Sequence, residues 1–276
     1  MYPSFCTERS RATINRDRAK QTFLDYASHY DMNDPKIRLK VEHTLFVCAL
    51  CERIAGSLSL SPEDTELMWL TGLLHDIGRF EQVRLYHTFR DSESVDHAQF
   101  GADLLFQKGL VRDYIDEASF DGIIEKAIRN HNAYRLPEDL SDRERTFCQI
   151  LRDADKIDIL RVNRQTPMTQ IYNLPKEAFL YSEISDPVFD DLLHHRDVNR
   201  KNSKTGIDFL MGHIAFVFGL VYPVSIEIIR EQGYLDQMLA FESCNENTRR
   251  RMEIIRSEVR AYMQDRTRPA GPSTLS

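Results

Sequence analysis

The sequence LLHDIGRF, at residues 73–80, joins an apolar run to two ionisable side chains. The run starts at residue 67 and leads directly into His75 and Asp76. We expect it to form a helix that ends at Gly78, because glycine tolerates the left-handed backbone that terminates helices. An ionisable pair at the buried end of an apolar helix is costly unless something compensates it. A metal ion would do so by binding a neutral imidazole and an ionised carboxylate, and a hydrogen-bonded structural pair is the alternative.

The composition favours an all-α protein. The 276 residues include only 11 glycines and 10 prolines, and the periodic apolar segments between them are long. A net charge of −7 argues against a protein that holds duplex DNA on a broad basic surface. It is compatible with a small phosphorylated substrate held by a few local cations. The length suits one large domain, or one domain with a helical extension.

The sequence also indicates where the protein works. No apolar run approaches the roughly 18 residues that span a bilayer, and the polar N-terminal segment lacks the apolar centre of a signal peptide. The scattered, odd-numbered cysteines favour buried reduced thiols over disulfides or a zinc ribbon; they are Cys6, Cys48, Cys51, Cys148 and Cys244. We therefore expect a cytoplasmic protein that does not bind membranes. The sequence does not indicate its oligomeric state.

Apolar periodicity and helix-capping residues divide the chain into helices. In the first part of the chain we expect helices at about 15–30, 35–56, 61–76, 97–108, 120–131 and 141–162, with a loop at 79–94. In the last part we expect a buried apolar helix at 206–222 and amphipathic helices near 223–241 and 247–264. The predicted organisation is a flexible N-terminus at 1–14, a helical domain at 15–164, a C-terminal helical region packed on it at 165–265, and a disordered tail at 266–276.

Two of these helices carry further side chains able to bind a metal. His43 lies on the apolar stripe of its helix, where a lone histidine is more often a core residue. Asp155 shares a face with apolar residues of the long helix that starts near residue 141, and a carboxylate there needs a cation, a metal or a network of hydrogen-bond donors. Because this helix is apolar over a wide arc, spacing alone does not choose among Asp153, Asp155 and Asp158.

Taken together, these residues resemble the HD superfamily of metal-dependent phosphohydrolases. The pattern of that family is one histidine, an adjacent His-Asp pair and a later aspartate, each on a different helix of an α-bundle. The segments EHTL at 42–45, LHDIGR at 74–79 and ADKI at 154–157 are similar to the motif contexts of the family. The resemblance covers about residues 38–160. It implies an all-α HD-domain helical bundle with a C-terminal helical extension.

Two more segments, DHAQFGA at 96–102 and RNHN at 129–132, resemble the additional motifs of binuclear members of the family. The resemblance implies one metal site made by His43, His75, Asp76 and Asp155, and a second made by Asp76, His97 and His131. The alternatives are a surface histidine at a helix start for His97 and a helix C-terminal cap for His131. Without the second ion the enzyme would be mononuclear. The Gly-Tyr-Pro signature of the HD-GYP branch is absent, so a cyclic dinucleotide substrate is not implied.

The implied ligands suit one or two ions of Mn, Fe, Co, Ni or Zn, with a metal-activated water attacking phosphorus, so Asp76 is a catalytic residue as well as a ligand. Arg79 follows the His-Asp motif and Lys156 follows Asp155. Both are candidate catalytic and phosphate-binding residues, with salt bridges as the alternative. Further candidates for binding the substrate, which also fit as solvated surface groups, are Arg84, His87, Arg90 and Arg135. Asp96 is a candidate to orient a neighbouring ligand as well as to cap its helix.

The sequence therefore predicts a metal-dependent hydrolase of phosphate esters that acts on a nucleotide or another small phosphorylated metabolite. The chain has no G-x-x-x-x-G-K-[ST] loop, so ATP-driven chemistry is not expected. Two other functions stay open. Some HD-fold proteins with the same order of six ligands are diiron oxygenases. A purely structural metal could instead stabilise a non-catalytic interaction protein.

Overall fold

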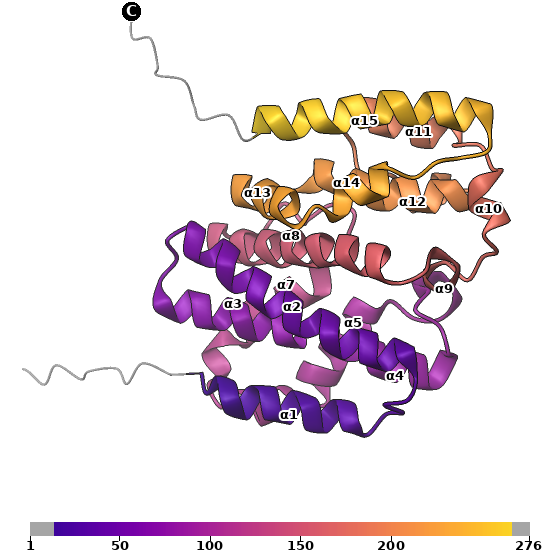
Figure 1. Cartoon of the computed structure of the whole chain (residues 1–276). Coiled ribbons are helices and arrows are strands. Elements are labelled where there is room, and N and C mark those ends of the chain that lie inside the picture. Colours follow the sequence, from indigo (N-terminus) through magenta and orange to yellow (C-terminus); the bar gives the residue numbers. More distant parts are fainter. Residues whose placement is uncertain (1–13, 267–276) are drawn as a thin grey trace, which may run out of the picture. The chain divides into compact units, whose positions relative to one another are not determined.

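The computed structural model describes residues 14–266, and the chain folds into two compact units (Figure 1). The first unit holds the described residues up to Asn130 together with Ser141–Phe147, and the second holds His131–Leu140 and the described residues from Cys148 onward. These residues form helices and no strand, which confirms the all-α class. The predicted flexible N-terminus and disordered tail lie outside the described residues, except for residues 14 and 266. The predicted domain boundary near residue 164 stays a prediction.

The first unit is built from short and medium helices. The α-helices are α1 (Arg16–Ser28), α2 (Pro35–Ser57), α3 (Pro62–Leu74), α4 (Ile77–Tyr86), α5 (His97–Ala102), α6 (Val111–Tyr114) and α7 (Asp121–Asn130). Between them lie the 3₁₀ turns η1 (Asp91–Glu93) and η3 (Ala118–Phe120) and the π-helical turn η2 (Asp103–Gln107). The long helix α8 (Asp142–Gln165) begins in this unit and continues into the second.

Local signals in the sequence set the starts of the first helices. The side chains of Asn15, Asp34 and Ser61 each accept a hydrogen bond from a backbone N–H of the helix that follows. Pro35 and Pro62 occupy the start of the second and third helices, where the missing N–H of proline costs nothing. The helices predicted at about 35–56 and 61–76 are therefore confirmed as α2 and α3.

Gly78 does not end a helix, so that prediction is wrong. After the turn at His75 and Asp76 a new helix, α4, runs through the first half of the segment predicted to be a loop. Gly78 lies in the first turn of α4 without a positive φ. A Cβ at this position would lie 2.6 Å from the backbone nitrogen of Gly101 and from the carbonyl oxygen of His97. Glycine is needed here because the backbones of α4 and α5 approach closely.

The loop that remains covers residues 87–96 and is shorter than predicted. His87 ends α4 in the left-handed conformation, with a φ of 56°. The loop then passes through η1 to Asp96, whose side chain accepts hydrogen bonds from Ala98 and Gln99 and so caps α5. The predicted capping role of Asp96 is therefore confirmed.

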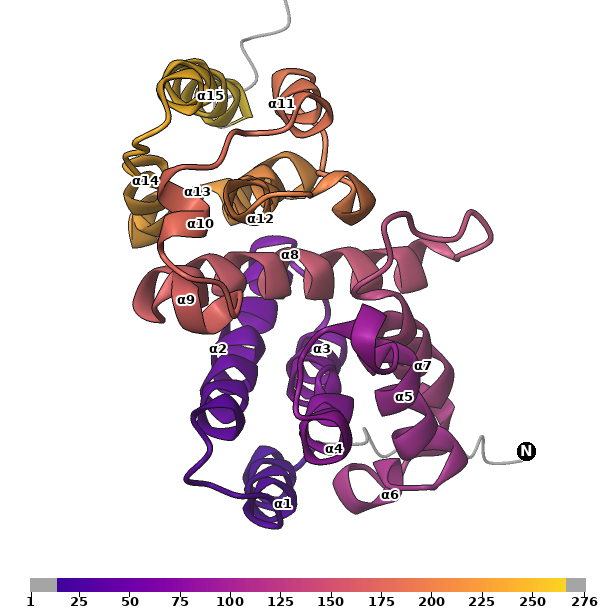
Figure 2. The ribbon, with the colours of Figure 1, turned by 90° about the vertical axis from the view of Figure 1, so that its right-hand side faces the viewer.

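The apolar faces of α2 and α3 pack against each other in the core of the first unit (Figure 2). Val47 and Ile54 from α2 and Leu70 from α3 are fully buried. From α1, Phe23 meets the ring of Phe80 on α4 edge to face, with 5.7 Å between the ring centroids. Burying these side chains removes a large apolar area from water and fixes these helices relative to one another.

The second unit continues from α8 through shorter helices (Figures 1 and 2). They are α9 (Met168–Ile171), α10 (Glu177–Leu180), α11 (Asp186–Leu193), α12 (Gly206–Ile214), α13 (Pro223–Gln232), α14 (Tyr234–Leu239) and α15 (Glu246–Arg266), with the 3₁₀ turns η4 (Arg200–Asn202) and η5 (Ala215–Gly219). The apolar helix predicted at 206–222 thus ends at Ile214 and continues as a 3₁₀ turn. The helix predicted at 223–241 is divided at Gly233, whose φ of 68° terminates α13.

No helix among residues 14–266 is both long and apolar enough to cross a membrane. Cys48, Cys51 and Cys148 are buried thiols, and Cys244 is an exposed one; none of the four is in a disulfide. The predicted burial of these thiols therefore holds for Cys48, Cys51 and Cys148 but not for Cys244, while Cys6 lies outside the described residues.

Candidate metal centre

Three of the predicted ligands meet in the interior of the first unit. His43 lies on α2, and His75 and Asp76 form the turn between α3 and α4; each is at most 2% exposed. The Nε2 atoms of His43 and His75 lie 3.6 and 3.4 Å from Oδ2 of Asp76. Two donors that each lie about 2.1 Å from one tetrahedral ion are roughly 3.4 Å apart. The spacing therefore suits a shared metal ion.

The protonation pattern of His75 also suits a metal. Its Nδ1 lies 2.7 Å from the carbonyl oxygen of Gly72, and a carbonyl can only accept a hydrogen bond. Nδ1 therefore carries the proton in the neutral ring, and the lone pair of Nε2 faces Asp76. This is the tautomer that a metal ligand requires.

A fourth predicted ligand, His97, approaches the other oxygen of Asp76. Its Nε2 lies 3.5 Å from Oδ1, and its side chain is almost fully buried at the start of α5. The close packing of Gly78 against Gly101 brings α5 near the His-Asp turn. One carboxylate oxygen thus faces His43 and His75 while the other faces His97, which is the arrangement of a carboxylate able to bridge two ions.

The charge balance keeps Asp76 ionised. Burial alone would raise its pKa, but the positive charge of Lys40, whose Nζ lies 2.5 Å from Oδ2, holds the pKa of Asp76 well below its ordinary value. For His97, burial and then the charge of Arg79 lower the pKa, and these effects outweigh Asp91 and Asp76. A neutral imidazole beside an ionised carboxylate is the pairing that metal binding needs.

Sequence reasoning missed Lys40. Its Nζ lies 2.5 Å from Oδ2 of Asp76, and the side chain is 15% exposed. Its ammonium also lies 5.5 Å from the ring centroid of Phe89 in the loop. Lys40 precedes His43 by three residues on α2, so its side chain points to the same face. That helical spacing from a candidate ligand is the signal that could have revealed it.

Sequence reasoning also missed Asp91. Its Oδ2 lies 2.6 Å from Nδ1 of His97, and its Oδ1 accepts hydrogen bonds from Arg79 at 2.8 Å and from Gln82 at 3.0 Å. The residue is six positions from His97 in an irregular loop, so neither helical spacing nor a motif could have predicted this contact. Asp96, the predicted orienting residue, accepts hydrogen bonds from the backbone N–H groups of Ala98 and Gln99 and so caps α5.

Arg79 reaches toward both Asp76 and the loop. Its Nε lies 3.7 Å from Oδ1 of Asp76. Its Nη1 donates to Gln82 at 2.8 Å, to the carbonyl oxygen of Phe89 at 2.6 Å and to Asp91 at 2.8 Å. The structure therefore places Arg79 at the candidate metal centre, with several of its donors directed at protein groups.

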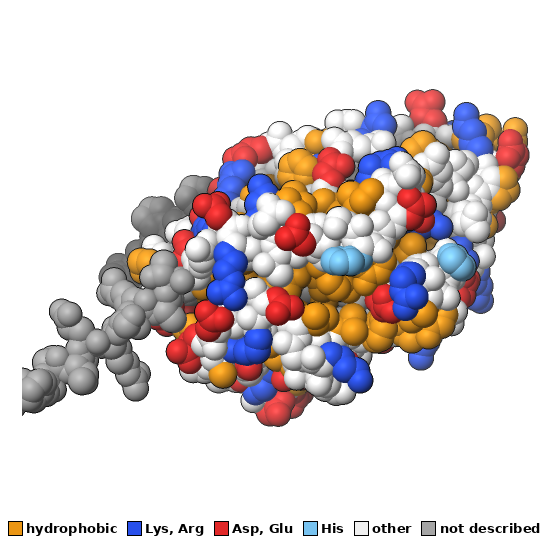
Figure 3. Space-filling model, turned by 90° about the horizontal axis from the view of Figure 1, so that it is seen from below, with side chains coloured by type: hydrophobic (Ala, Val, Ile, Leu, Met, Phe, Trp, Pro, Cys, Tyr) orange, Lys and Arg blue, Asp and Glu red, His pale blue; other side chains and the backbone are white. Residues whose placement is uncertain are grey.

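The other predicted substrate-binding groups of the first unit lie on its surface. Arg84 pairs with Glu81, and Arg90 lies 2.7 Å from Glu93. His87 is exposed, and its carbonyl oxygen accepts a hydrogen bond from Lys36 at 3.1 Å. Figure 3 shows one face of the molecule, on which Lys and Arg side chains are mixed with Asp and Glu.

The remaining predicted site residues belong to the second unit. His131 is 5% exposed and directly follows the last residue of α7. Lys156 is also buried; its Nζ lies 2.7 Å from Oδ2 of Asp197 and 5.4 Å from the ring centroid of Phe216. Arg135 is exposed. The ion pair that the sequence offered as an alternative for Lys156 is therefore present.

Spacing left three aspartates on α8 as candidate metal ligands. The structure shows that two of them, Asp153 and Asp158, have structural partners instead. Asp153 accepts hydrogen bonds from the backbone N–H groups of Val221 and Tyr222 at 3.0 to 3.1 Å and from the hydroxyl of Ser225 at 2.7 Å. It thereby serves the N-terminus of α13, and burial raises its pKa. Asp158 is fully buried against Arg161, with 2.6 Å between Oδ1 and Nε. Asp155 is half-buried.

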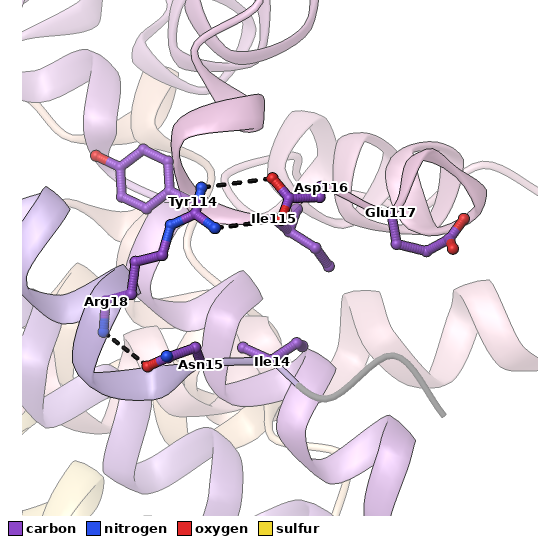
Figure 4. A pocket seen from close by; sticks show the side chains of 7 residues that line it. All are labelled: Ile14, Asn15, Arg18, Tyr114, Ile115, Asp116 and Glu117. Atoms are coloured by element: carbon purple, nitrogen blue, oxygen red, sulfur yellow. Dashed lines mark hydrogen bonds and ion pairs between the residues drawn. The ribbon is translucent and has the colours of Figure 1, made fainter. Parts of the chain in front are cut away.

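A separate pocket of about 390 Å³ lies elsewhere in the first unit (Figure 4). It is lined by Ile14, Asn15, Arg18, Tyr114, Ile115, Asp116 and Glu117. Arg18 crosses it to Asp116, with 3.2 Å between Nη1 and Oδ2. None of the predicted site residues lines this pocket.

The model of the HD domain family matches residues 41–160. The matched segment contains all six predicted ligands, and HD domains bind divalent metal ions. The comparisons with curated proteins and with solved structures gave no match. The family match and the buried His-Asp cluster agree with each other: residues 41–160 of this chain match the HD domain, a family whose members are generally metal-dependent hydrolases.

Proposed function

We propose that this protein hydrolyses phosphate esters with the help of one or two divalent transition-metal ions, and that its substrate is a nucleotide or another small phosphorylated metabolite. The observation that carries the proposal is the buried carboxylate of Asp76. Its two oxygens face histidines from three different segments, at N···O distances of 3.4 to 3.6 Å. A hydrogen-bonded structural pair would need only one of these histidines.

The proposed first site uses His43, His75 and Asp76, completed by Asp155, and the proposed second site uses Asp76 and His97, completed by His131. When bound, ions of this kind lower the pKa of a water and take up charge on a phosphoryl oxygen. The residues of the chain would hold the two ligand oxygens of Asp76 ionised and present neutral imidazole nitrogens. Support for Asp155 comes from the structural tasks that Asp153 and Asp158 already perform on the same helix.

Lys40 is the proposed phosphate contact. Its ammonium lies beside Asp76, its side chain is partly exposed, and α2 carries it on the same face as His43. A phosphoryl oxygen next to the centre would meet this charge directly. Arg84, His87, Arg90, Arg135 and Lys156 stay candidates for the outer part of a substrate, although Arg84, Arg90 and Lys156 already have carboxylate partners.

The proposal can be tested on the full chain reconstituted in turn with Mn, Fe, Co, Ni and Zn. Phosphate release is measured with nucleoside mono-, di- and triphosphates, a generic phosphomonoester and a generic phosphodiester. We expect hydrolysis of at least one class, reduced 100-fold or more in Asp76→Ala and unchanged in Asp113→Ala, a matched control that removes an exposed carboxylate. Circular dichroism checks that both variants fold.

Two outcomes would overturn the proposal. Oxygen uptake by the iron-loaded protein, without phosphate release from any substrate, would identify the oxygenase alternative. Tight metal binding with neither activity, and a centre closed to exchangeable water, would identify a structural metal.

A further inference from the structure

We propose that Asp91 is a positioning residue of the metal centre. Its carboxylate fixes the ring of His97 so that Nε2 is presented to the second of the two proposed metal sites. This inference rests on the proposed function, because it assigns a task to a residue that supports one of the proposed ligands. Nothing in the sequence motifs or in the family match marks Asp91.

The geometry places the His97 ring between two carboxylates. Nδ1 lies 2.6 Å from Oδ2 of Asp91, and Nε2 lies 3.5 Å from Oδ1 of Asp76. The first distance is that of a strong charge-assisted hydrogen bond, whereas the second leaves room for an ion between the two atoms. The two ends of the ring therefore have different tasks.

The chemistry of the contact fixes the tautomer. The other oxygen of Asp91, Oδ1, already accepts hydrogen bonds from Arg79 and Gln82, and the positive charge of Arg79 favours the ionised carboxylate. An ionised carboxylate can only accept, so Nδ1 of His97 must carry the proton. The lone pair is then on Nε2, which faces Asp76. Carboxylates that hold metal-binding histidines in this way also raise their basicity.

Asp91 is itself held by α4, the helix that begins directly after Asp76. Arg79 and Gln82 lie three residues apart on this helix and therefore share a face. Both donate to Oδ1 of Asp91, at 2.8 and 3.0 Å. The side chain of Gln82 is fully buried and also donates to the carbonyl oxygen of Val95 at 3.0 Å. The loop at 87–96 is thus fastened to the helix whose first turn carries the shared ligand.

This arrangement gives Arg79 a task in addition to the predicted catalytic and phosphate-binding roles, which stay predictions. Its Nη1 serves Asp91, Gln82 and the backbone of Phe89, all of which belong to the support of His97. We infer that Arg79 also supports His97, through its hydrogen bond to Asp91. Glu93 lies in the same loop, is exposed and pairs with Arg90 at 2.7 Å, so it offers a matched control only two residues from Asp91.

The test measures metal binding instead of turnover. Metal-stripped full-length protein is titrated with Mn(II), stoichiometry is determined by elemental analysis, and paired ions are detected by the electron paramagnetic resonance signal of coupled Mn(II). Wild type should bind two ions per chain and His97→Ala one. Asp91→Asn keeps the shape of the side chain but loses its negative charge. This variant should lower the affinity for the second ion 10- to 100-fold and remove the coupled signal at limiting Mn(II). Glu93→Gln should bind both ions as wild type does, because the carboxylate of Glu93 is exposed and pairs with Arg90.

A second variant keeps the test decisive if Asp91→Asn folds poorly. Gln82→Ala leaves both carboxylates in place but loosens the loop, so it should also lower the affinity for the second ion. If wild type binds two ions and these variants, folded by circular dichroism, bind both with unchanged affinity, the role of Asp91 is wrong while the proposed function stands. If wild type binds no more than one ion and His97→Ala changes nothing, the second site itself is wrong, and the role of Asp91 falls with it.

Discussion

The ammonium of Lys40 lies 2.5 Å from Oδ2 of Asp76, the same oxygen that faces the Nε2 atoms of His43 and His75. Lys40 is therefore the nearest formal positive charge to the most buried carboxylate of the centre. In protein stripped of metal, this lysine must offset most of the cost of burying Asp76.

We expect Lys40→Met to destabilise metal-stripped protein by about 2 kcal/mol, because it leaves Asp76 buried without its closest cation. A bound ion compensates the carboxylate in the variant as well, so the loss should be smaller when metal is present. The rise in Tm on adding Mn(II) should therefore be larger in Lys40→Met than in wild type, by roughly 4–8 °C.

The measurement is thermal unfolding with a chelator and with saturating Mn(II). Lys36→Met is the matched control, because Lys36 lies on the same helix and its ammonium donates to the carbonyl oxygen of His87, at 3.1 Å. Equal metal-induced shifts in Lys40→Met and wild type would show that Lys40 does not compensate Asp76.

We expect Gly78→Ala to damage both stability and the second site. The added Cβ would lie 2.6 Å from backbone atoms of Gly101 and His97, which can move only if α5 moves. Displacing α5 carries His97 away from Asp76. The variant should lose about 2 kcal/mol of unfolding free energy and bind fewer metal ions than wild type.

Gly122→Ala provides the control for this substitution. A Cβ at Gly122, on α7, meets nothing within 4 Å, so alanine should be neutral or stabilise the helix by up to about 1 kcal/mol. Chemical denaturation and elemental analysis of the two variants test the comparison. A Gly78→Ala protein as stable and as metal-rich as Gly122→Ala would contradict the close-packing explanation.

The second unit contains a histidine whose titration should appear in the stability profile. Nδ1 of His213 lies 2.6 Å from the hydroxyl of Tyr172 and 2.9 Å from Oδ1 of Asn163. Burial, and then the charge of Arg200, lower the pKa of His213 to about 3. A histidine in the unfolded chain titrates near 6.5, so the unfolded state takes up the proton first as the pH falls.

The stabilising contribution of neutral His213 is therefore complete above about pH 6.5 and is lost progressively as the pH falls toward 3. We expect His213→Asn, which cannot take up this proton, to lose about 1–2 kcal/mol less than wild type between pH 7.5 and pH 5. The other histidines titrate in both proteins, so the difference between the two profiles isolates His213. Parallel profiles would show that its pKa is ordinary.

Much of the fold could be predicted because its signals are local. The caps at Asp34 and Ser61, each followed by proline, set the starts of α2 and α3 without reference to the rest of the chain. Gly78 was misinterpreted because a glycine can serve either a left-handed turn or a close approach of two backbones. Only the position of Gly101, 23 residues later in the sequence, distinguishes the two.

The candidate site also contains residues that could be predicted from the sequence and residues that could not. His43, His75 and Asp76 could be predicted because they occur in the sequence in the order of the family motif. The structure brings the three together. Lys40 and Asp91 could not be predicted, because the role of a lysine on a helix or of an aspartate in a loop depends on the side chains that it contacts in the folded protein. Asp153 could not be separated from Asp155 because its partners come from the start of α13, far along the chain.

The existence of a metal centre at Asp76 can be observed directly by anomalous X-ray scattering from crystals of the Mn(II)-loaded protein. We predict one anomalous peak about 2.0–2.2 Å from Nε2 of His43, Nε2 of His75 and Oδ2 of Asp76, and a second on the side of Oδ1 that faces His97. A crystal of metal-saturated protein with no anomalous peak in contact with Asp76 would contradict the proposed centre and the hydrolase function built on it.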